Sequence, residues 1–336
     1  MDNIDIILGL DSGQSFLKMS CSVITKPQIQ NKDQPKRLRL SDGYGSSSAF
    51  LNSSVKKTFI LGMIPITEEG HFNIRSLIES VGIPSFNFSM SQDIKVILDL
   101  LGKQPASSKH PCPYCDASND FNCDGDVNLY TLDILNEWHN KFLASGLPKE
   151  KAMNFSNVLN RPILVGDGNV PIWQIINIPE LHILLGITMK LILALEKIIE
   201  KDGMITFSRF LAENNIKRIC YQGQQRLDGN QCRSFINKAE LLTDFFQPIK
   251  CTADPEPYIR LVIKFRDVVD SCFGKELKSN FKEKIELFCK TYRDLSLKPN
   301  VKFHILEIHI VEFLAFKQNL FGLGHWTEQE CGFKKS

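Results

Sequence analysis

The stretch SQDIKVILDLLGKQPASSKHPCPYCD, residues 91–116, joins an aspartate to a pair of cysteines. Asp93 stands at the end of the short alternating run SFNFSMSQ (85–92), and Cys112 follows it by nineteen residues in the knuckle Cys-Pro-Tyr-Cys. Alternation of apolar and polar residues predicts a strand. A Cys-x2-Cys pair supplies two zinc ligands from one turn. The stretch therefore predicts a strand that ends at an acid, followed by half of a metal site.

Three more strands and a helix are expected upstream of this stretch. Asp11-Ser12-Gly13 stands between the first two apolar runs and favours a hairpin with an acid at its tip. The expected strands are IDIILGL (4–10), SFLKMSCSVI (15–24) and KTFILGMIPI (57–66), and the expected helix is FNIRSLIESVG (72–82). Asp11 and Asp93 would then end the first and fourth strands of an α/β sheet.

The residues from Asp133 to about Leu295 have mostly helical periodicity, which predicts a large, mainly α region. Another helix is expected over 300–316, NVKFHILEIHIVEFLAF. The longest apolar segment, Leu181 to Ile199, is interrupted by Lys190 and Glu196, so we interpret it as a buried or amphipathic helix and expect no membrane span.

Two distant histidines complete the set of metal ligands. His309 follows His304 by five positions in a helical context. In an ideal helix this spacing places the two rings on adjacent turns, about 140° apart around the axis. This spacing suits structural zinc, and with Cys112 and Cys115 it makes a Cys2His2 set. Cys123 and His110 are the spare ligands. Four ligands predict a closed, structural site.

Charge and cysteine usage narrow the class of protein. Lysine and arginine number 40 against 38 acids, so a net charge of +2 gives no global attraction to nucleic acid, and the local basic run is 32–39, KDQPKRLR. The N-terminus MDNIDIILGLDSG carries acids where a secretory signal has lysine or arginine. We therefore expect an intracellular chain whose ten scattered cysteines are mostly reduced.

The acids support a catalytic hypothesis only as a group. Asp11 and Asp93 on adjacent strands would converge on Mg²⁺ or Mn²⁺, for which hard oxygen ligands are suited. Two such ions activate a water or a 3′-hydroxyl for displacement at a phosphodiester. Glu328 and Glu330 are the acids after the histidine pair from which a third carboxylate would come.

Taken in order, these residues resemble the catalytic core of the V(D)J recombinase and of Transib-type transposases, which is ribonuclease H-like. The matching elements are Asp11, Asp93 nineteen residues before Cys112 and Cys115, the pair His304 and His309, and the Gly-Asn-x-x-Arg element GNQCR (229–233). The likeness spans nearly the whole chain, and uncharacterised invertebrate transposon-derived proteins with HPCPWC and EGNQC motifs are similar too.

The resemblance implies a ribonuclease H-like mixed sheet with a large helical insertion and a structural zinc site. It divides the chain into residues 1–110 (first part of the core), 111–300 (zinc knuckle and helical insertion) and 301–336 (helices completing the zinc site and core). It also implies a nuclear protein that cleaves and joins DNA, with transposon ends or a remnant target as partner, acting as a homodimer. The ending WTEQECGFKKS departs from the family pattern, so an inactive, truncated or domesticated copy is the alternative within this family.

Two readings outside recombination stay open. The turn ILGLDSGQSF (7–16) also resembles the first phosphate motif of actin-like ATPases, heat-shock ATPases and sugar kinases, which predicts an ATP-dependent phosphotransferase. That hypothesis needs a second glycine-rich hairpin, for which GDGN (166–169) is the candidate. The other reading keeps the fold without catalysis, as a zinc-stabilised module that binds DNA or protein.

Overall fold

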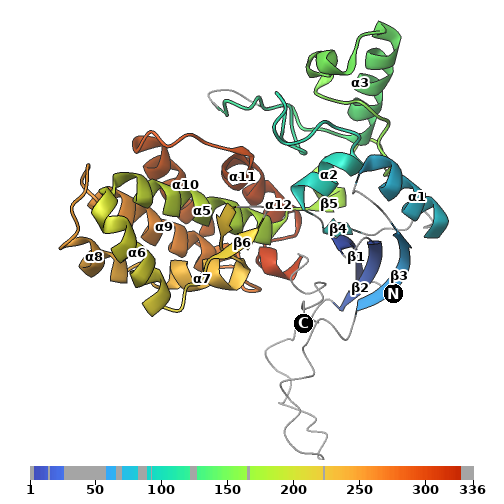
Figure 1. The fold of residues 1–336 in the computed structure, drawn as a ribbon. Helices are drawn as coiled ribbons and strands as arrows, with labels where there is room; N and C mark the ends of the chain where they lie inside the picture. The colour runs from blue at the N-terminus through green and yellow to red at the C-terminus, as the bar shows by residue number, and fades with distance from the viewer. Residues whose placement is uncertain are drawn as a thin grey trace, which may run out of the picture.

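The computed structural model describes residues 4–13, 16–25, 58–65, 70–81, 89–91, 93–121, 127–164, 167–221 and 224–326. The protein is a mixed α/β protein. A five-stranded sheet with its helices lies at one side of the molecule, and a group of helices lies at the other (Figure 1).

The sheet combines an antiparallel half with a parallel half. Its order is β3-β2-β1-β4-β5; β1 pairs antiparallel with β2 and β2 with β3, whereas β1 with β4 and β4 with β5 are parallel. The strands are β1 (Ile4–Gly13), β2 (Phe16–Thr25), β3 (Thr58–Pro65), β4 (Ser89–Ser91) and β5 (Ile176–Asn177). The long hairpin of β1 and β2 is thus extended on the β1 side by two very short strands, β4 and then β5 at the edge of the sheet.

Two helices follow the third and fourth strands in the chain and pack together: α1 (His71–Val81) and α2 (Ile94–Leu100). Leu17 and Met19 of β2 are fully buried, while Lys18 between them is half-buried, as the period of two in a strand requires. Helix α1 approaches β3 so closely that a Cβ at Gly62 would lie 2.5 Å from Val81 Cγ2. Glycine is therefore needed at that point of the sheet.

The chain between α2 and β5 forms a smaller group of helices. Helix α3 (Leu132–Ser145) begins at Thr131, whose hydroxyl accepts the Ile134 N–H, and ends at Gly146 in the left-handed conformation. The 3₁₀ helix η2 (Lys149–Phe155) and the short helix α4 (Ile172–Ile175) follow.

The helical group is built around α5 (Glu180–Ile198), which contacts α7, α9 and α11. Because neighbours cover several sides of α5, its apolar residues are not confined to one stripe. The other elements are α6 (Lys201–Glu213), the hairpin β6 (Ile219–Tyr221) and β7 (Gln224–Arg226), α7 (Gly229–Asn237), α8 (Leu241–Phe246), α9 (Glu256–Cys272), α10 (Phe281–Asp294), α11 (Val301–His304), the π-helical turn η3 (Ile305–His309), α12 (Ile310–Phe316) and η4 (Leu323–His325).

The expected strands over 4–10, 15–24 and 57–66 and the helix over 72–82 are confirmed. Of the run 85–92, residues 89–91 form β4, and the rest lies outside the described residues. The region expected to be mostly helical differs in two places: it contains the hairpin β6–β7, and it contributes β5 to the sheet. A strand of two residues has no measurable periodicity, so sequence patterns do not reveal it.

No described helix is long and apolar enough to cross a membrane. The eight described cysteines form no disulfide. The basic run 32–39 lies outside the described residues.

Candidate metal centre

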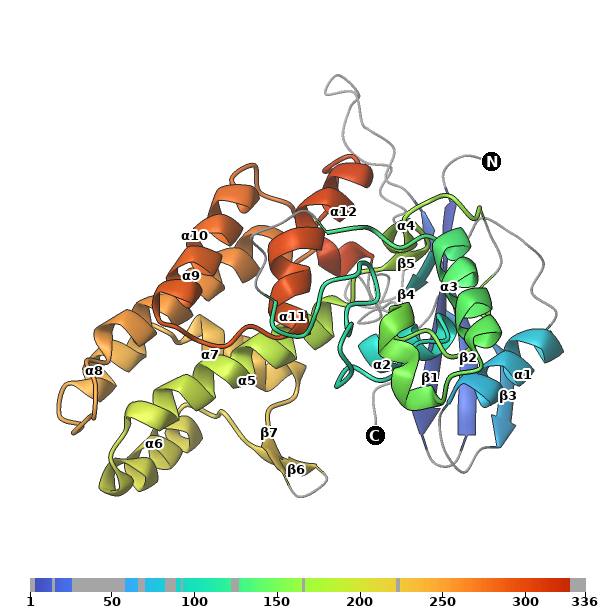
Figure 2. The same ribbon diagram turned by 90° about the horizontal axis from the view of Figure 1, so that it is seen from above.

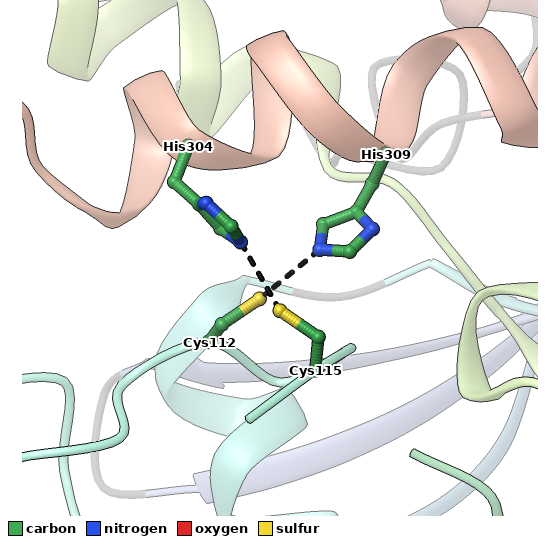
Figure 3. A group of neighbouring side chains, drawn as sticks. All are labelled: Cys112, Cys115, His304 and His309. Atoms are coloured by element: carbon green, nitrogen blue, oxygen red, sulfur yellow. Dashed lines mark hydrogen bonds between the residues drawn. The ribbon is translucent and has the colours of Figure 1, made fainter. Parts of the chain in front are cut away.

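Four side chains from distant parts of the chain meet between the Cys112 segment and the α11–η3 turn (Figure 3). Figure 2 shows the loop after α2 running beside α11. They are the predicted ligands Cys112, Cys115, His304 and His309, and all four are fully buried. Their ligand atoms all lie within 4.8 Å of one another. Cys112 Sγ is 3.5 Å from His309 Nε2, and Cys115 Sγ is 3.1 Å from His304 Nε2.

These separations suit a tetrahedral ion. With bonds of about 2.3 Å to sulfur and 2.0 Å to nitrogen, a sulfur and a nitrogen around one zinc are about 3.5 Å apart. Two thiolates and two imidazoles are also the donor set that zinc prefers. The buried cluster could therefore hold a metal such as zinc, with the four protein ligands completing its coordination.

The cysteine half is held by its own short loop. The Tyr114 N–H donates to Cys112 Sγ at 3.4 Å, so the knuckle folds its backbone around the first sulfur. The buried Tyr114 side chain then crosses to the sheet, where its hydroxyl donates to the carbonyl of Asn177 in β5. The backbone of Cys115 forms an isolated antiparallel β-bridge with that of Leu129, which lies shortly before α3. The knuckle is thereby attached to the sheet edge.

The histidine half depends on a π-helical turn. In an ideal α-helix, residues five apart differ by about 140°, which would point one ring away from the cysteines. Residues Ile305–His309 instead form a π turn, in which the Ile310 N–H donates to the Ile305 carbonyl. The extra residue in this turn rotates His309 back toward the face that carries His304. Their rings lie 5.1 Å apart between centroids.

The pKa values of the two cysteine thiols are shifted in opposite directions. Burial alone would raise the pKa of Cys112, but hydrogen bonds from the Cys115 thiol and from the Tyr114 and Cys115 N–H groups lower it. The pKa of Cys115 is raised to about 12, first because its thiol hydrogen-bonds to Cys112 and second because it is buried. Zinc binds the thiolate form of cysteine, so a bound metal would displace the protons of these thiols.

A buried lysine lies beside the cluster. Lys103 Nζ is 4.0 Å from the centroid of the Tyr130 ring, and Lys103 is only 4% exposed. Burial lowers the pKa of Lys103 to about 7, whereas the nearby charges of Cys112, Cys115 and Asp116 act in the opposite direction. Lys103 is therefore placed to compensate the thiolate charge from outside the ligand set.

Of the spare ligands, His110 does not enter the cluster. His110 instead donates from Nδ1 to the Asp116 carbonyl at 2.8 Å, and its backbone N–H donates to Asn157 Oδ1. Cys123 lies outside the described residues.

Asp11 and Asp93, the first two predicted acids, lie toward the same end of the sheet. β1 and β4 are parallel with Gly9 opposite Ser91, and Asp11 and Asp93 each come two residues later. The structure describes Asp11 through its backbone, which pairs with Lys18 in β2. The two positions are thus level with each other at the carboxyl ends of adjacent parallel strands.

Asp93 is the N-cap of α2. Its Oδ1 accepts the N–H groups of Lys95 at 2.5 Å and Val96 at 3.0 Å. His182 of α5 and Lys302 of α11 lie within electrostatic range: burial lowers the pKa of both, and the Asp93 carboxylate acts in the opposite direction on both. His182 is half-buried there, not in the core as the apolar run around it would predict.

Glu328 and Glu330 lie outside the described residues. The segment before them is well anchored: Trp326 is buried, and Asn177 Nδ2 donates to its carbonyl at 2.8 Å. The C-terminal segment therefore contacts β5, the edge strand of the sheet, at the last described residue.

Sequence reasoning missed one functional-looking pair. Glu180 is fully buried and accepts a hydrogen bond from Arg233, the arginine of the GNQCR element. Arg233 Nη2 also donates to the Phe273 carbonyl at 3.4 Å. The sequence signal was present in the arginine, but no pattern linked it to a glutamate fifty-three residues earlier.

A scan of the chain against models of known families finds no match, and none of the curated proteins matches it.

Proposed function

We propose that this protein has a ribonuclease H-like core that cleaves and transfers DNA strands with the help of divalent metal ions. The strand order β3-β2-β1-β4-β5, with three antiparallel strands followed by two parallel ones, supports this fold. The order of strands, helix and acids is also that of the recombinase and transposase cores that the sequence resembles.

The observation that carries the proposal is the register of β1 and β4. Since Gly9 is opposite Ser91, each aspartate lies two residues downstream of this last pair, toward the end of the sheet where parallel α/β proteins bind ligands. Either aspartate alone would be ordinary, because strand-ending aspartates commonly cap turns and helices. Their common level is what a shared metal site needs.

Each residue has a defined role in this proposal. Asp11 and Asp93 would hold Mg²⁺ or Mn²⁺, with Glu328 or Glu330 as the third carboxylate. Bound ions would supply an activated water or 3′-hydroxyl and stabilise the leaving oxygen. Asp93 Oδ1 is oriented by two backbone N–H groups of α2.

The Cys2His2 cluster has an architectural role. Zinc at Cys112, Cys115, His304 and His309 would bind the segment beside the sheet to the last helices, which lie against α5. A nuclear location, a DNA partner and a homodimer belong to the same proposal.

A second candidate, a non-catalytic DNA- or protein-binding module, is favoured by Lys302. A Cβ at Gly186 would lie 2.0 Å from Lys302 Cδ, so this side chain crosses α5 at the glycine and brings its charge toward Asp93. A cation there competes with a divalent metal for the carboxylate.

The phosphotransferase hypothesis is weaker. In the loop GDGN, a Cβ at Gly168 would lie 2.1 Å from Asp133 Oδ1, and the Gly168 carbonyl accepts the Asp133 N–H. The described part of this loop is thus packed against the start of α3, with an acid where ATP phosphates would need positive or neutral donors.

The test is nicking of supercoiled and linear duplex DNA in Mg²⁺ and in Mn²⁺. Wild type should nick, and Asp11→Asn and Asp93→Asn should each lose at least about 100-fold in rate, the order expected when a stabiliser of the transition state is removed. Asp270→Asn, a substitution of an exposed acid in α9, is the control and should retain the rate. DNA binding without nicking by wild type would instead favour the non-catalytic module.

A further inference from the structure

Four basic side chains from three segments gather at the C-terminal end of α2. They are His71 and Arg75 of α1, His139 of α3 and Arg161. His71 Nδ1 donates to the Asp99 carbonyl at 2.6 Å, and Arg75 Nη2 contacts His71 Nε2 at 3.2 Å and the Arg161 carbonyl at 3.1 Å. We call these four residues the α1–α3 basic cluster.

The hydrogen bonds determine the charge of His71. A carbonyl only accepts, so Nδ1 carries the proton; a guanidinium only donates, so Nε2 is the acceptor. His71 is therefore a neutral ring that orients Arg75 without neutralising it. Arg75 Nη2 is occupied by these two neutral acceptors, while its Nε and Nη1 retain donors for a ligand.

The two arginines of the cluster have no carboxylate partner among the described residues. Arg75 and Arg161 share this with the exposed Arg209, whereas five other arginines form ion pairs: Arg218, Arg233, Arg260, Arg266 and Arg293. Arg161 is exposed, and Arg75 and His139 are half-buried, so the group is accessible from outside.

The positive charges are close enough to act on the histidines. Burial and then the charges of Arg161 and Arg75 lower the pKa of His139. The pKa of His71 is lowered mainly by burial. The hydrogen bond to the Asp99 carbonyl raises this pKa, and the charges of Arg75 and His139 lower it further. The positive charge of Arg75 and Arg161, which no described carboxylate compensates, attracts an anion.

We propose that the α1–α3 basic cluster binds a backbone phosphate of duplex DNA, in an inference that rests on the proposed function. Guanidinium groups match phosphate oxygens in bidentate geometry, and Arg75 is already oriented by His71. Helix α2 spans seven residues, about 10 Å, and carries Asp93 at its other end. The phosphate is therefore a few nucleotides from the one at which the aspartates would act, since phosphates of one strand follow every 3.4 Å or so along the helix axis.

The experiment measures affinity for a fluorescent 30-base-pair duplex by anisotropy over a series of salt concentrations. Arg75→Gln/Arg161→Gln removes two unpaired charges while keeping amide donors. Lys141→Gln/Arg260→Gln is the matched control, because it removes two exposed charges that already have carboxylate partners. Far-UV circular dichroism and melting verify that both proteins are folded.

The cluster variant should bind more weakly, and the magnitude of the slope of log K against log salt should fall by about 1, since each phosphate contact contributes roughly 0.9. The control should keep the wild-type slope. Equal losses in both variants, or wild-type binding in both, would overturn the inference while leaving the proposed function standing. Failure of wild type to bind duplex at low salt would overturn both. Calorimetric binding of inorganic phosphate to the cluster, with duplex affinity unchanged, would assign the site to a free anion instead.

Discussion

Glu180 and Arg233 form an ion pair whose two members differ in exposure. The Glu180 side chain is fully buried, whereas that of Arg233 is 32% exposed. A Cβ at Gly324 would lie 3.2 Å from Glu180 Oε2, so the C-terminal segment passes directly over the pair. The pair therefore lies where α5, α7 and the segment before Trp326 meet.

We predict an asymmetric response to substitution of this pair. Arg233→Met leaves a fully buried carboxylate without its cation and should cost about 3–5 kcal/mol of unfolding free energy. Glu180→Gln keeps a hydrogen-bond acceptor for an arginine that water partly solvates, so it should cost about 1.5–3 kcal/mol. Urea denaturation measures both. The opposite order would mean that Arg233, not Glu180, bears the desolvation penalty.

The Asp93 side chain at the start of helix α2 has two roles, one structural and one proposed. Asp93 caps the helix through Oδ1, and it is also a proposed metal ligand. The two roles have different chemical requirements: capping needs a short side-chain acceptor, which Asn also provides, whereas binding Mg²⁺ needs a carboxylate.

Substitutions of Asp93 should therefore separate capping from catalysis. Asp93→Asn should leave unfolding free energy within about 0.5 kcal/mol of wild type, while Asp93→Ala should lose about 1 kcal/mol with the cap. Nicking activity should be lost in both. Denaturation and nicking assays on the same variants measure stability and activity separately. A large destabilisation of Asp93→Asn would show that the charge itself has a structural role.

The π turn η3 is the element that sequence periodicity described least well. Spacing predicted two histidines on adjacent turns and about 140° apart, which is correct for a regular helix. The structure inserts one extra residue in that turn, and both rings then reach the cysteines. Period-based reasoning assumes a uniform helix, so it identifies the ligands but not the local distortion that aligns them.

For the whole molecule, the metal centre connects chain segments separated by 189 and 197 residues. One zinc per chain should be found by elemental analysis, and it should be absent from Cys112→Ser/His309→Ala. Chelation should lower Tm by roughly 10 °C, the shift expected for a loss of about 5 kcal/mol in a large domain.

The control for this prediction is Cys220→Ser/Cys251→Ser, which changes two cysteines outside the cluster and should retain both zinc and Tm. A wild-type protein that contains no zinc, or whose melting is indifferent to chelation, would contradict the architectural role of the cluster.

Local sequence patterns are enough to predict part of this protein. The strands of the first hairpin and helix α1 follow from periodicity, and the ligand set of Cys112, Cys115, His304 and His309 follows from ligand chemistry. The contacts between distant residues are visible only in the folded chain: β5 beside β4, Arg233 on Glu180, Lys302 near Asp93, and Arg75 beside Arg161. The reason is physical, because local patterns report which face of an element is apolar, whereas long-range pairs arise from the packing of those faces against one another.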